Sequence, residues 1–542
     1  MTQLFIIFSF LVWAISLLGL GCFANKFIKK WLKDFEISEE SRILYYGTLG
    51  FIVISVVGTI FNFFISLGAA FSMIILTIGI ALFFFYRKNI LPAWQSINIL
   101  GVFIPLSYSC LLSVTDLKNY DTFLYHMPMI KLISSSALPF GLANLNDKFG
   151  FNSAWFIDAS VVSPLKFLTN SPFFIINAIA YFFFGTFIFL ALVRMIKESR
   201  INLSSIFVLT TFIPWCYCLT SFISSPSPDV PTMLLTLFVT FLLIKNFETK
   251  NINYLFVALI ISFYIVTIKL SAVPYFAEIF MILFILFIFK NYLKNINSLI
   301  IAKLSMIKYI IAGIILSIMA IPYLIKGIIS SGYIAFPSTF GHINLKWSVP
   351  VDSAISAANY IKSWAEKPGA DSNEVLGNWN WLKPWFYQVI NDKSLLCAFI
   401  IGIIIVIVCF ILKKIKYLNV FAFIFCLSLI GCLFWFFTAP ALRFGYGYLY
   451  SSICILLAYG IFNLLDNKML VNSFLKLTFV IFILTLFFQN NINFKEVYNI
   501  SETKREAEWY FNRPLMSISQ SKENLKIIFD KNNNPKIIWI EK

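Results

Sequence analysis

Apolar runs of about 20 residues recur along the whole chain, and short polar segments separate them. A run of this length spans the hydrocarbon core of a bilayer when it folds as an α-helix. About 14 such spans can be placed from the pattern, with the predicted bounds 5–24, 44–66, 68–86, 97–115, 172–193, 203–222, 229–246, 253–270, 272–290, 309–329, 395–412, 418–437, 446–464 and 473–489. The pattern therefore predicts an all-α polytopic membrane protein.

The composition supports this class and excludes several others. Of the 542 residues, 60% are hydrophobic and 12% are charged. A soluble domain is nearer half apolar and a quarter charged. The nine cysteines are odd in number and have no spacing typical of a metal site or a disulfide framework. These values exclude a soluble globular enzyme, a disordered chain and a disulfide-stapled scaffold.

The net charge of +17 reflects membrane topology rather than nucleic-acid binding. Twenty Lys and Arg residues lie in the odd-numbered connections between predicted spans, whereas the short even-numbered connections hold only Arg443. Basic residues in short loops mark the cytoplasmic side of a membrane. The two long loops, 116–171 and 330–394, are therefore predicted to face outward. We expect a bilayer as partner, no nucleic acid, and the polar chemistry on the outward face.

Three regions are predicted along the chain. Residues 1–96 hold N-terminal transmembrane helices, residues 97–489 form the transmembrane core with the two outward loops, and residues 490–542 form a short outward tail. Within the tail, Ile527–Phe529 and Ile537–Ile540 flank an Asn-rich turn and are predicted to be two short strands.

The first outward loop carries the strongest candidates for catalysis. Residues 121–136 alternate polar and apolar groups like a short interfacial helix, with Asp121 and Tyr125 on one face. A carboxylate held just beyond a membrane helix can act as a general base or ligate a metal; alternatively, Asp121 only caps the helix. His126 would orient Asp121, or bind a metal or a phosphate oxygen. Asp116 is a second candidate, for which the capping role is favoured.

Two further loop segments hold residue types that contact sugars. In the turn-rich stretch after residue 138, Asn144, Asn152 and Trp155 either contact a sugar or serve the loop's own structure. His342 in the second long loop is a candidate substrate or metal contact. Five tryptophans of that loop are predicted mainly to form a belt at the membrane surface, with sugar stacking as the alternative, namely Trp347, Trp364, Trp379, Trp381 and Trp385.

Three charged residues stand at or near the ends of predicted spans, and a fourth, Glu278, lies inside the span 272–290. Lys269 is a functional candidate because a cation at membrane depth is costly, although it could instead snorkel to the interface and could pair with Glu278. Asp229 either caps its helix or contributes to a substrate or metal site. Arg443 departs from the positive-inside pattern, and its planar fork suits a phosphate.

Taken together, an outward Asp after an early span, an interfacial helix behind it and an outward Arg near the end resemble the GT-C glycosyltransferase superfamily. More narrowly, an uncharacterised family of bacterial GT-C-like membrane proteins is similar over roughly residues 100–460. The similarity rests on the segments YDTFLYHMPMIK, GLANLNDKFGFNSAWF, SSPSPD, KWSVP and TAPALRFGYG.

The resemblance implies an inverting enzyme of the bacterial inner (cytoplasmic) membrane whose active face is extracytoplasmic. It would move a sugar from a polyprenyl-phosphate donor to a glycan, lipid or protein acceptor, as in cell-envelope polysaccharide biosynthesis. Asp121 would be the general base, Tyr125 and His126 would line the pocket, and Arg443 and Lys269 would hold the donor phosphate.

The cofactor requirement is left open by the resemblance. No cofactor is certain, and a divalent metal such as Mg²⁺ or Mn²⁺ would use Asp121 and His126. Two departures from the pattern are visible: Thr122 follows Asp121 where the superfamily often has a second acidic residue, and Ala441-Leu442 replaces the Asp-Pro of the narrower family. The alternatives are a GT-C-type polysaccharide polymerase or ligase, and a flippase or transporter of lipid-linked sugars.

Overall fold

The computed structural model of the protein describes residues 2–90, 96–115, 117–163, 173–289, 305–465, 467–488, 525–529 and 535–539. Within these ranges, eleven helices are long and apolar enough to cross a membrane. They are α1 (Thr2–Trp31), α2 (Arg42–Asn62), α3 (Ala69–Ile90), α7 (Ile176–Glu198), α10 (Asp229–Thr249), η5 (Leu270–Ala272) continued by α12 (Val273–Ile288), α15 (Met306–Ser331), α19 (Lys393–Ile411), α20 (Leu418–Thr438), α21 (Leu442–Leu464) and α22 (Lys468–Phe488).

Shorter apolar helices account for the other predicted spans: α4 (Ser96–Ser113), α8 (Leu203–Thr210) with α9 (Phe212–Tyr217), and α11 (Asn253–Ile268). The prediction of a polytopic helical membrane protein is therefore confirmed. The number of helices that cross the bilayer completely stays a prediction.

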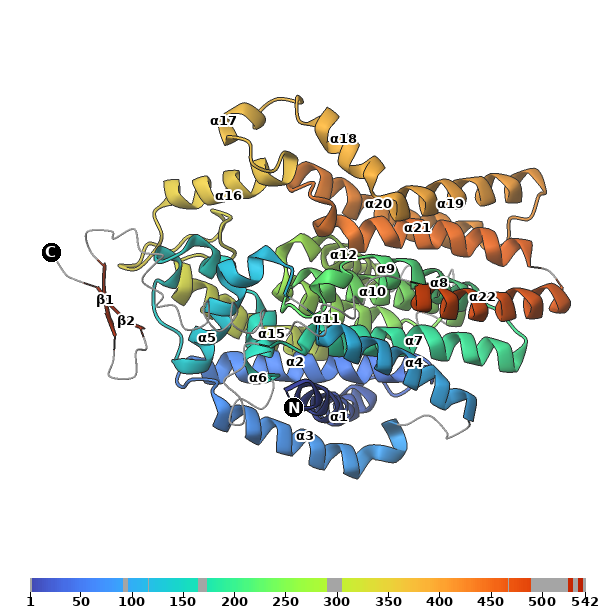
Figure 1. Ribbon diagram of the computed structural model, residues 1–542, viewed down its shortest axis with the longest axis horizontal. Helices are drawn as coiled ribbons and strands as arrows, with labels where there is room; N and C mark the ends of the chain where they lie inside the picture. Colours follow the sequence, from blue (N-terminus) through green and yellow to red (C-terminus); the bar gives the residue numbers. More distant parts are fainter. Residues whose placement is uncertain are drawn as a thin grey trace.

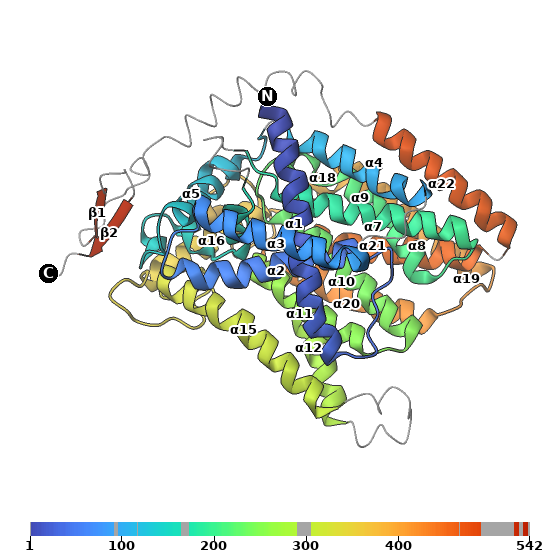
Figure 2. The same cartoon turned by 90° about the horizontal axis from the view of Figure 1, so that it is seen from below.

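The helices form a bundle with α7 and α10 near its centre and α3, α19 and α22 at its edges (Figure 1). The side chains of α7 and α10 are buried almost throughout, whereas those of the three edge helices are mostly exposed although they are apolar. A helix satisfies its own backbone hydrogen bonds, so it can face lipid with an entirely apolar surface. At one side of the bundle, α15 runs outward at an angle to the other helices (Figure 2).

The first long loop folds into short helices at one end of the bundle (Figure 1). The stretch predicted as an interfacial helix begins with one π-helical turn and continues as an α-helix. Its helical conformation is therefore confirmed, whereas its place at the membrane surface stays a prediction. The elements in chain order are η1 (Thr122–His126), α5 (Met127–Ser135), η2 (Leu142–Asn144), η3 (Asp147–Phe151) and α6 (Ala154–Val161).

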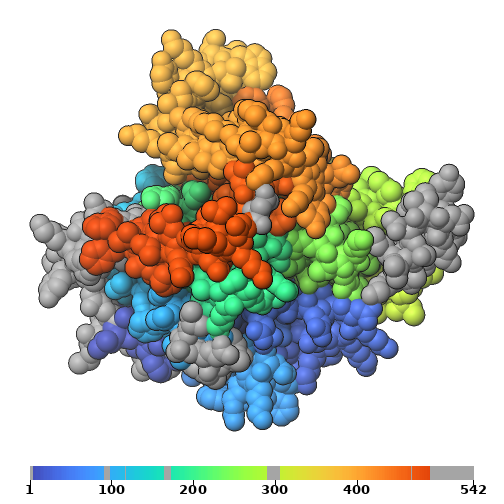
Figure 3. Space-filling model, turned by 90° about the vertical axis from the view of Figure 1, so that its right-hand side faces the viewer, coloured from blue at the N-terminus to red at the C-terminus, as the bar shows by residue number. Residues whose placement is uncertain are grey.

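The second long loop contains three helices that the sequence analysis did not assign. They are α16 (Val351–Glu366), α17 (Ser372–Val375) and α18 (Leu382–Asn391). This segment, gold in both views, stands out from the bundle (Figures 1 and 3). Trp385 of α18 ties it back to the residues just before α21, because its indole donates a hydrogen bond to the carbonyl of Pro440 at 2.6 Å. The Trp385 ring also lies beside the Trp435 ring of α20, and Trp435 donates to the carbonyl of Ala441 at 2.8 Å.

In the C-terminal tail, β1 (Leu525–Phe529) and β2 (Pro535–Trp539) pair antiparallel with Ile527 opposite Ile537. The prediction of two short strands is confirmed, except that Ile540 lies outside the described residues.

Candidate functional site

A cavity of about 430 Å³ lies at the end of the bundle where α10 begins and α11 ends. It is called the charged cavity below. Four charged side chains that line it stand at the ends of different elements: Asp121 precedes η1, Asp229 begins α10, Lys269 follows α11, and Arg443 is the second residue of α21. The structure therefore brings together four residues that are far apart in the sequence.

The helix dipoles suit two of these charges and oppose a third. Asp229 lies at the positive end of α10, and Lys269 lies at the negative end of α11, so both are stabilised. Arg443 stands at the positive end of α21, where a cation is disfavoured. Arg443 consequently depends on nearby carboxylates for its stability.

The four charges alternate in sign along a chain of contacts. An Nη of Arg443 lies 2.8 Å from a carboxylate oxygen of Asp121, and its Nε lies 3.7 Å from Asp229. Lys269 donates a hydrogen bond to the other oxygen of Asp229. The order is therefore Asp121, Arg443, Asp229, Lys269. In this arrangement Lys269 does not snorkel, because its ammonium has a carboxylate partner inside the cavity.

The capping roles considered for the two carboxylates are not observed. Asp121 occupies the N-cap position of η1, but its side chain makes no capping hydrogen bond. Asp229 is the first residue of α10, after Pro228 in the N-cap position, and only 6% of its surface is exposed. Both side chains instead contact cations across the cavity.

Aromatic rings cover the two cations. The Trp364 ring of α16 has its centroid 5.1 Å from Cζ of Arg443, and the Phe444 ring lies 3.6 Å from Nζ of Lys269. A cation over an aromatic face gains electrostatic stabilisation that increases when water is excluded. Trp364 thus lines the charged cavity, and its place in a belt at the membrane surface stays a prediction.

Tyr125 and His126 both line the charged cavity, as predicted. Burial raises the pKa of Tyr125 well above its usual value, so the phenol stays protonated. Burial also lowers the pKa of His126 to about 3, and the nearby Arg443 and Lys269 act in the same direction, whereas Asp229 opposes them. His126 is therefore neutral at physiological pH.

Several polar atoms at the cavity have no hydrogen-bond partner within the described part of the chain. They are both ring nitrogens of His126, the hydroxyl of Ser271 and Nε of Arg443. His126 is 1% exposed, and an unpaired buried polar group costs about 1–3 kcal/mol. A polar ligand in the cavity would remove this cost.

The structure places four other predicted pocket residues outside the charged cavity. The Trp155 side chain is fully buried and donates a hydrogen bond to Asn177, so it belongs to the packed core. Asn144 donates to the carbonyl of Trp347 at 2.8 Å and thereby joins the two long loops. The sugar contacts expected of these residues are replaced by contacts within the protein.

Asn152 and His342 likewise hold loops together. Asn152 has a left-handed backbone with φ 54°, and its amide donates to the carbonyl of Tyr323 on α15. His342 pairs through its backbone with Tyr333, and its ring stacks on the Tyr333 ring at 4.6 Å. Asp116 lies outside the described residues.

The pairing of Lys269 with Glu278 is not observed. Lys269 contacts Asp229 instead, and both carboxylate oxygens of Glu278 lack a hydrogen-bond partner in the described ranges. Glu278 lies in the second turn of α12, whereas Asp229 begins the neighbouring α10. The fold, rather than proximity in sequence, decides which carboxylate Lys269 meets.

Sequence reasoning missed most of the outer wall of the cavity, although it gave sugar stacking as an alternative role for Trp364. Tyr360 and Trp364 lie one turn apart on α16 and both line it, together with Asp147 and Lys148 of η3. Nζ of Lys148 lies 5.3 Å from the Tyr360 ring centroid. The i, i+4 spacing of these two aromatic residues in an amphipathic stretch was the available signal.

The described residues contain no group of three or more His, Cys, Asp or Glu side chains placed to hold a metal ion. Of the two ligands considered for Mg²⁺ or Mn²⁺, Asp121 already has Arg443 as its positive partner. A divalent cation at Asp121 would compete with this guanidinium.

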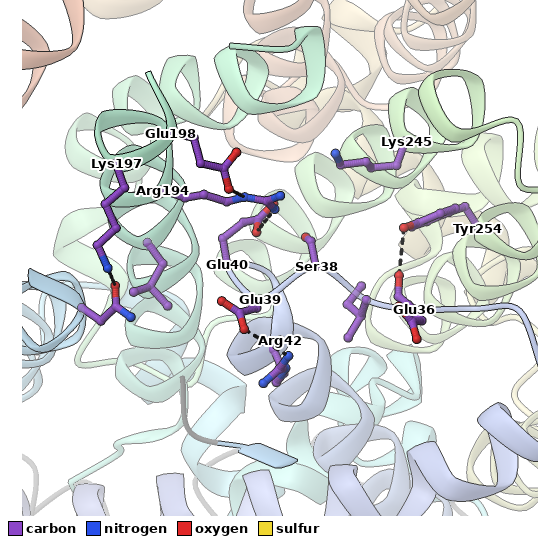
Figure 4. Close-up of a pocket in the computed structure, with 13 residues that line it drawn as sticks. Glu36, Ser38, Glu39, Glu40, Arg42, Arg194, Lys197, Glu198, Lys245 and Tyr254 are labelled. Atoms are coloured by element: carbon purple, nitrogen blue, oxygen red, sulfur yellow. Dashed lines mark hydrogen bonds and ion pairs between the residues drawn. The ribbon is translucent and has the colours of Figure 1, made fainter. Parts of the chain in front are cut away.

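A second cavity, of about 750 Å³, lies at the opposite end of α10 and α11 (Figure 4). Its charges mostly pair with each other. Arg194 contacts Glu40 at 2.7 Å and Glu198 at 2.8 Å, and Lys197 donates to Asn98. This network joins the connection between α1 and α2 to α7. It differs from the charged cavity, where polar atoms of His126 remain unpaired.

A buried polar cluster lies behind the charged cavity. Asp158 is fully buried and accepts hydrogen bonds from Ser55 at 2.7 Å and from Tyr264 at 2.6 Å. Burial raises the pKa of Asp158 to about 7, opposed by the two hydroxyls and by Lys326. Lys326 is 2% exposed and donates to the carbonyl of Ser153, which lines the charged cavity.

The fold and the charged cavity define a multi-pass helical membrane protein with a polar, partly unsatisfied site at one end of its bundle. The chain belongs to the family described as a domain of unknown function, DUF8201, whose sequence model matches residues 3–450. The match includes Asp121, Asp229, Lys269 and Arg443. No curated protein and no solved structure matches the chain.

Proposed function

We propose that the protein is an integral-membrane glycosyltransferase that moves a sugar from a polyprenyl-phosphate donor to an acceptor hydroxyl at the outward face of a bacterial inner membrane. The observation that carries the proposal is the charged cavity itself. Two cations, Arg443 and Lys269, flank Asp229, and Asp121 lies beside Arg443 in the same cavity. One small cavity thus holds cations that can bind a phosphate and a carboxylate that can accept a proton.

In the proposed reaction, the acceptor hydroxyl oxygen attacks the anomeric carbon of the donor sugar and its proton passes to Asp121. The bond between the anomeric carbon and the phosphate oxygen breaks, and the polyprenyl phosphate leaves with the electron pair. Arg443 and Lys269 stabilise the charge that develops on this oxygen. The nucleophile enters opposite the leaving group, so the anomeric configuration inverts.

The surroundings of the cavity favour a lipid-linked substrate. The cavity is lined by Phe434, Thr438 and Ala439 at the end of α20, a helix whose outer face is largely exposed and apolar. A substrate whose polar head occupies the cavity could therefore keep its hydrocarbon chain in the bilayer. The basic residues gathered at the other end of α10 and α11 support an outward orientation of the cavity.

A polysaccharide polymerase or ligase would use the same donor class and the same four charges. A flippase or transporter is the second class of candidate, and one observation favours it. The cluster of Asp158 and Lys326 places buried ionisable groups between the helices, and groups of this kind mark ion and proton pathways in transporters. An assay for transfer of the sugar from the lipid-linked donor to an acceptor distinguishes the classes, because only the enzymes form the glycosylated acceptor.

The first test is native mass spectrometry of the purified protein in mild detergent, beside Arg443→Ala. We expect a co-purified polyprenyl phosphate or its sugar conjugate in the wild type and its loss in the variant. Arg87→Ala is the matched control, since Arg87 is an exposed arginine of α3 away from the cavity. Ordinary phospholipid alone in all three proteins, even after addition of polyprenyl phosphate, would contradict the proposed donor.

A further inference from the structure

Arg443 has two carboxylate neighbours that differ in how firmly they are held. Asp229 is 6% exposed and contacts both Lys269 and Arg443. The side chain of Asp121 is 20% exposed and is paired only with Arg443 among the ion pairs of the described residues. Asp121 also precedes a short π-helical turn rather than a long helix. Asp121 is therefore the more easily displaced partner.

Arg443 also has a hydrogen-bond donor that the described part of the protein does not use. Nε of Arg443 has no hydrogen-bond partner in the described chain, and its distance of 3.7 Å to Asp229 is too long for a hydrogen bond. An arginine binds phosphate best through two parallel N–H donors. In the free protein one Nη donor is taken by Asp121, so a phosphate that seeks both donors meets this carboxylate.

The charge balance leads to the same conclusion. Two cations and two carboxylates make the cluster neutral before a ligand arrives. An added phosphate brings a further negative charge into a partly buried site, where repulsion between like charges is strong. Movement of Asp121 away from Arg443 relieves this repulsion without opening the buried pair of Asp229 and Lys269.

We propose that a phosphate-bearing substrate displaces Asp121 from Arg443, so that the carboxylate becomes free to accept a proton only when the phosphate is in place. This inference rests on the proposed function, which it deepens by fixing the order of binding. The phosphate-linked donor binds first, and the acceptor hydroxyl is activated second. An acceptor that arrives alone meets a carboxylate that is still paired with a guanidinium.

The test is the affinity of the full-length protein in detergent for a short-chain polyprenyl phosphate, with the prenyl alcohol of the same length as the phosphate-free probe. Asp121→Asn removes the competing charge but keeps the side-chain shape. We expect it to bind the phosphate about fivefold more tightly than the wild type, since surface-accessible ion pairs contribute up to about that factor. Binding of the alcohol should stay unchanged.

Asp147→Asn is the matched control. Asp147 also lines the charged cavity, but its carboxylate contacts Lys148 at 3.3 Å rather than Arg443. A general gain in positive potential would strengthen phosphate binding in both variants, whereas displacement strengthens it in Asp121→Asn alone. Thermal unfolding of each variant checks that the fold is retained.

The outcomes separate this inference from the proposed function. In one outcome, Arg443→Ala abolishes phosphate binding, but Asp121→Asn binds the phosphate no more tightly than the wild type. This result supports the proposed function and contradicts the displacement of Asp121. Equal tightening in Asp121→Asn and Asp147→Asn also overturns it. If the wild type and every variant bind the phosphate no better than the alcohol, both proposals are wrong, because Arg443 then holds no phosphate.

Discussion

At the scale of single residues, His126 combines deep burial with unpaired ring nitrogens. Its side chain is 1% exposed and faces the charges of Asp229, Arg443 and Lys269. The two cations and the loss of water disfavour an imidazolium, and the single nearby carboxylate does not compensate for them. A neutral imidazole offers one donor and one acceptor to a ligand.

The neutral state of the His126 imidazole should affect how the stability of the protein depends on pH. The pKa of His126 falls from 6.5 in the unfolded chain to about 3 in the folded protein. Below pH 6.5 the unfolded chain therefore gains a proton that the folded protein does not. This contribution to stability, present at neutral pH, is lost as the pH falls towards 3, by up to about 1.4 kcal/mol per pH unit.

Thermal unfolding between pH 7 and pH 5 measures the effect. We expect the wild type to lose more stability over this interval than His126→Gln, whose side chain does not titrate. His342→Gln is the control because the His342 side chain is exposed. Parallel curves for the wild type and His126→Gln would show that the pKa of His126 is the same in the folded and unfolded states.

At the scale of elements, close approach between helices fixes the N-terminal part of the bundle. A Cβ added to Gly79 of α3 would lie 2.0 Å from Oγ of Ser16 and 2.6 Å from its carbonyl oxygen on α1. Gly19 of α1 meets the backbone of Gly79 in the same way. Small residues at such crossings let the backbones of membrane helices touch.

Replacement of Gly79 by alanine should therefore push α1 and α3 apart. We expect Gly79→Ala to lower the free energy of unfolding by about 1–3 kcal/mol, the usual cost of overpacking. Gly313→Ala on α15 is the control, because a Cβ at Gly313 meets nothing within 4 Å. Thermal unfolding in detergent compares the two. Equal stability of both variants would mean that α1 and α3 can separate without cost.

At the scale of the whole molecule, the two polar cavities lie at opposite ends of α10 and α11. A helix of 21 residues such as α10 is about 30 Å long, which matches the hydrocarbon thickness of a bilayer. The charged cavity begins at Asp229, and the second cavity includes Lys245 near the other end of the same helix. The two cavities are thus expected to open on opposite sides of the membrane.

Labelling of introduced cysteines in intact cells tests this arrangement. Lys367 follows α16 on the side of the charged cavity, and Arg200 follows α7 on the side of the second cavity; both are exposed. We expect a membrane-impermeant maleimide to label Lys367→Cys in intact cells and Arg200→Cys only after permeabilisation. The native protein gives the background from its own cysteines. The reverse pattern would invert the predicted topology.

The sequence by itself determined the class of the protein and the end of the helices at which its candidate site residues lie. Apolar runs of about 20 residues specify membrane helices because each run must bury its own length in lipid. The same runs confine charges to their ends, so Asp121, Lys269 and Arg443 could be predicted to lie at one face. The length of an apolar run and the position of a charge relative to it are properties of one segment, so they can be read from the sequence of that segment.

Only the tertiary structure decided which of these residues meet. Lys269 pairs with Asp229 rather than with Glu278, Trp364 lies against Arg443, and Trp155 is in the core. Such contacts join positions far apart along the chain, and many helix ends reach the same membrane face. The choice among them depends on how the helices pack, because the shape of neighbouring side chains, rather than the period of any one segment, sets their distances.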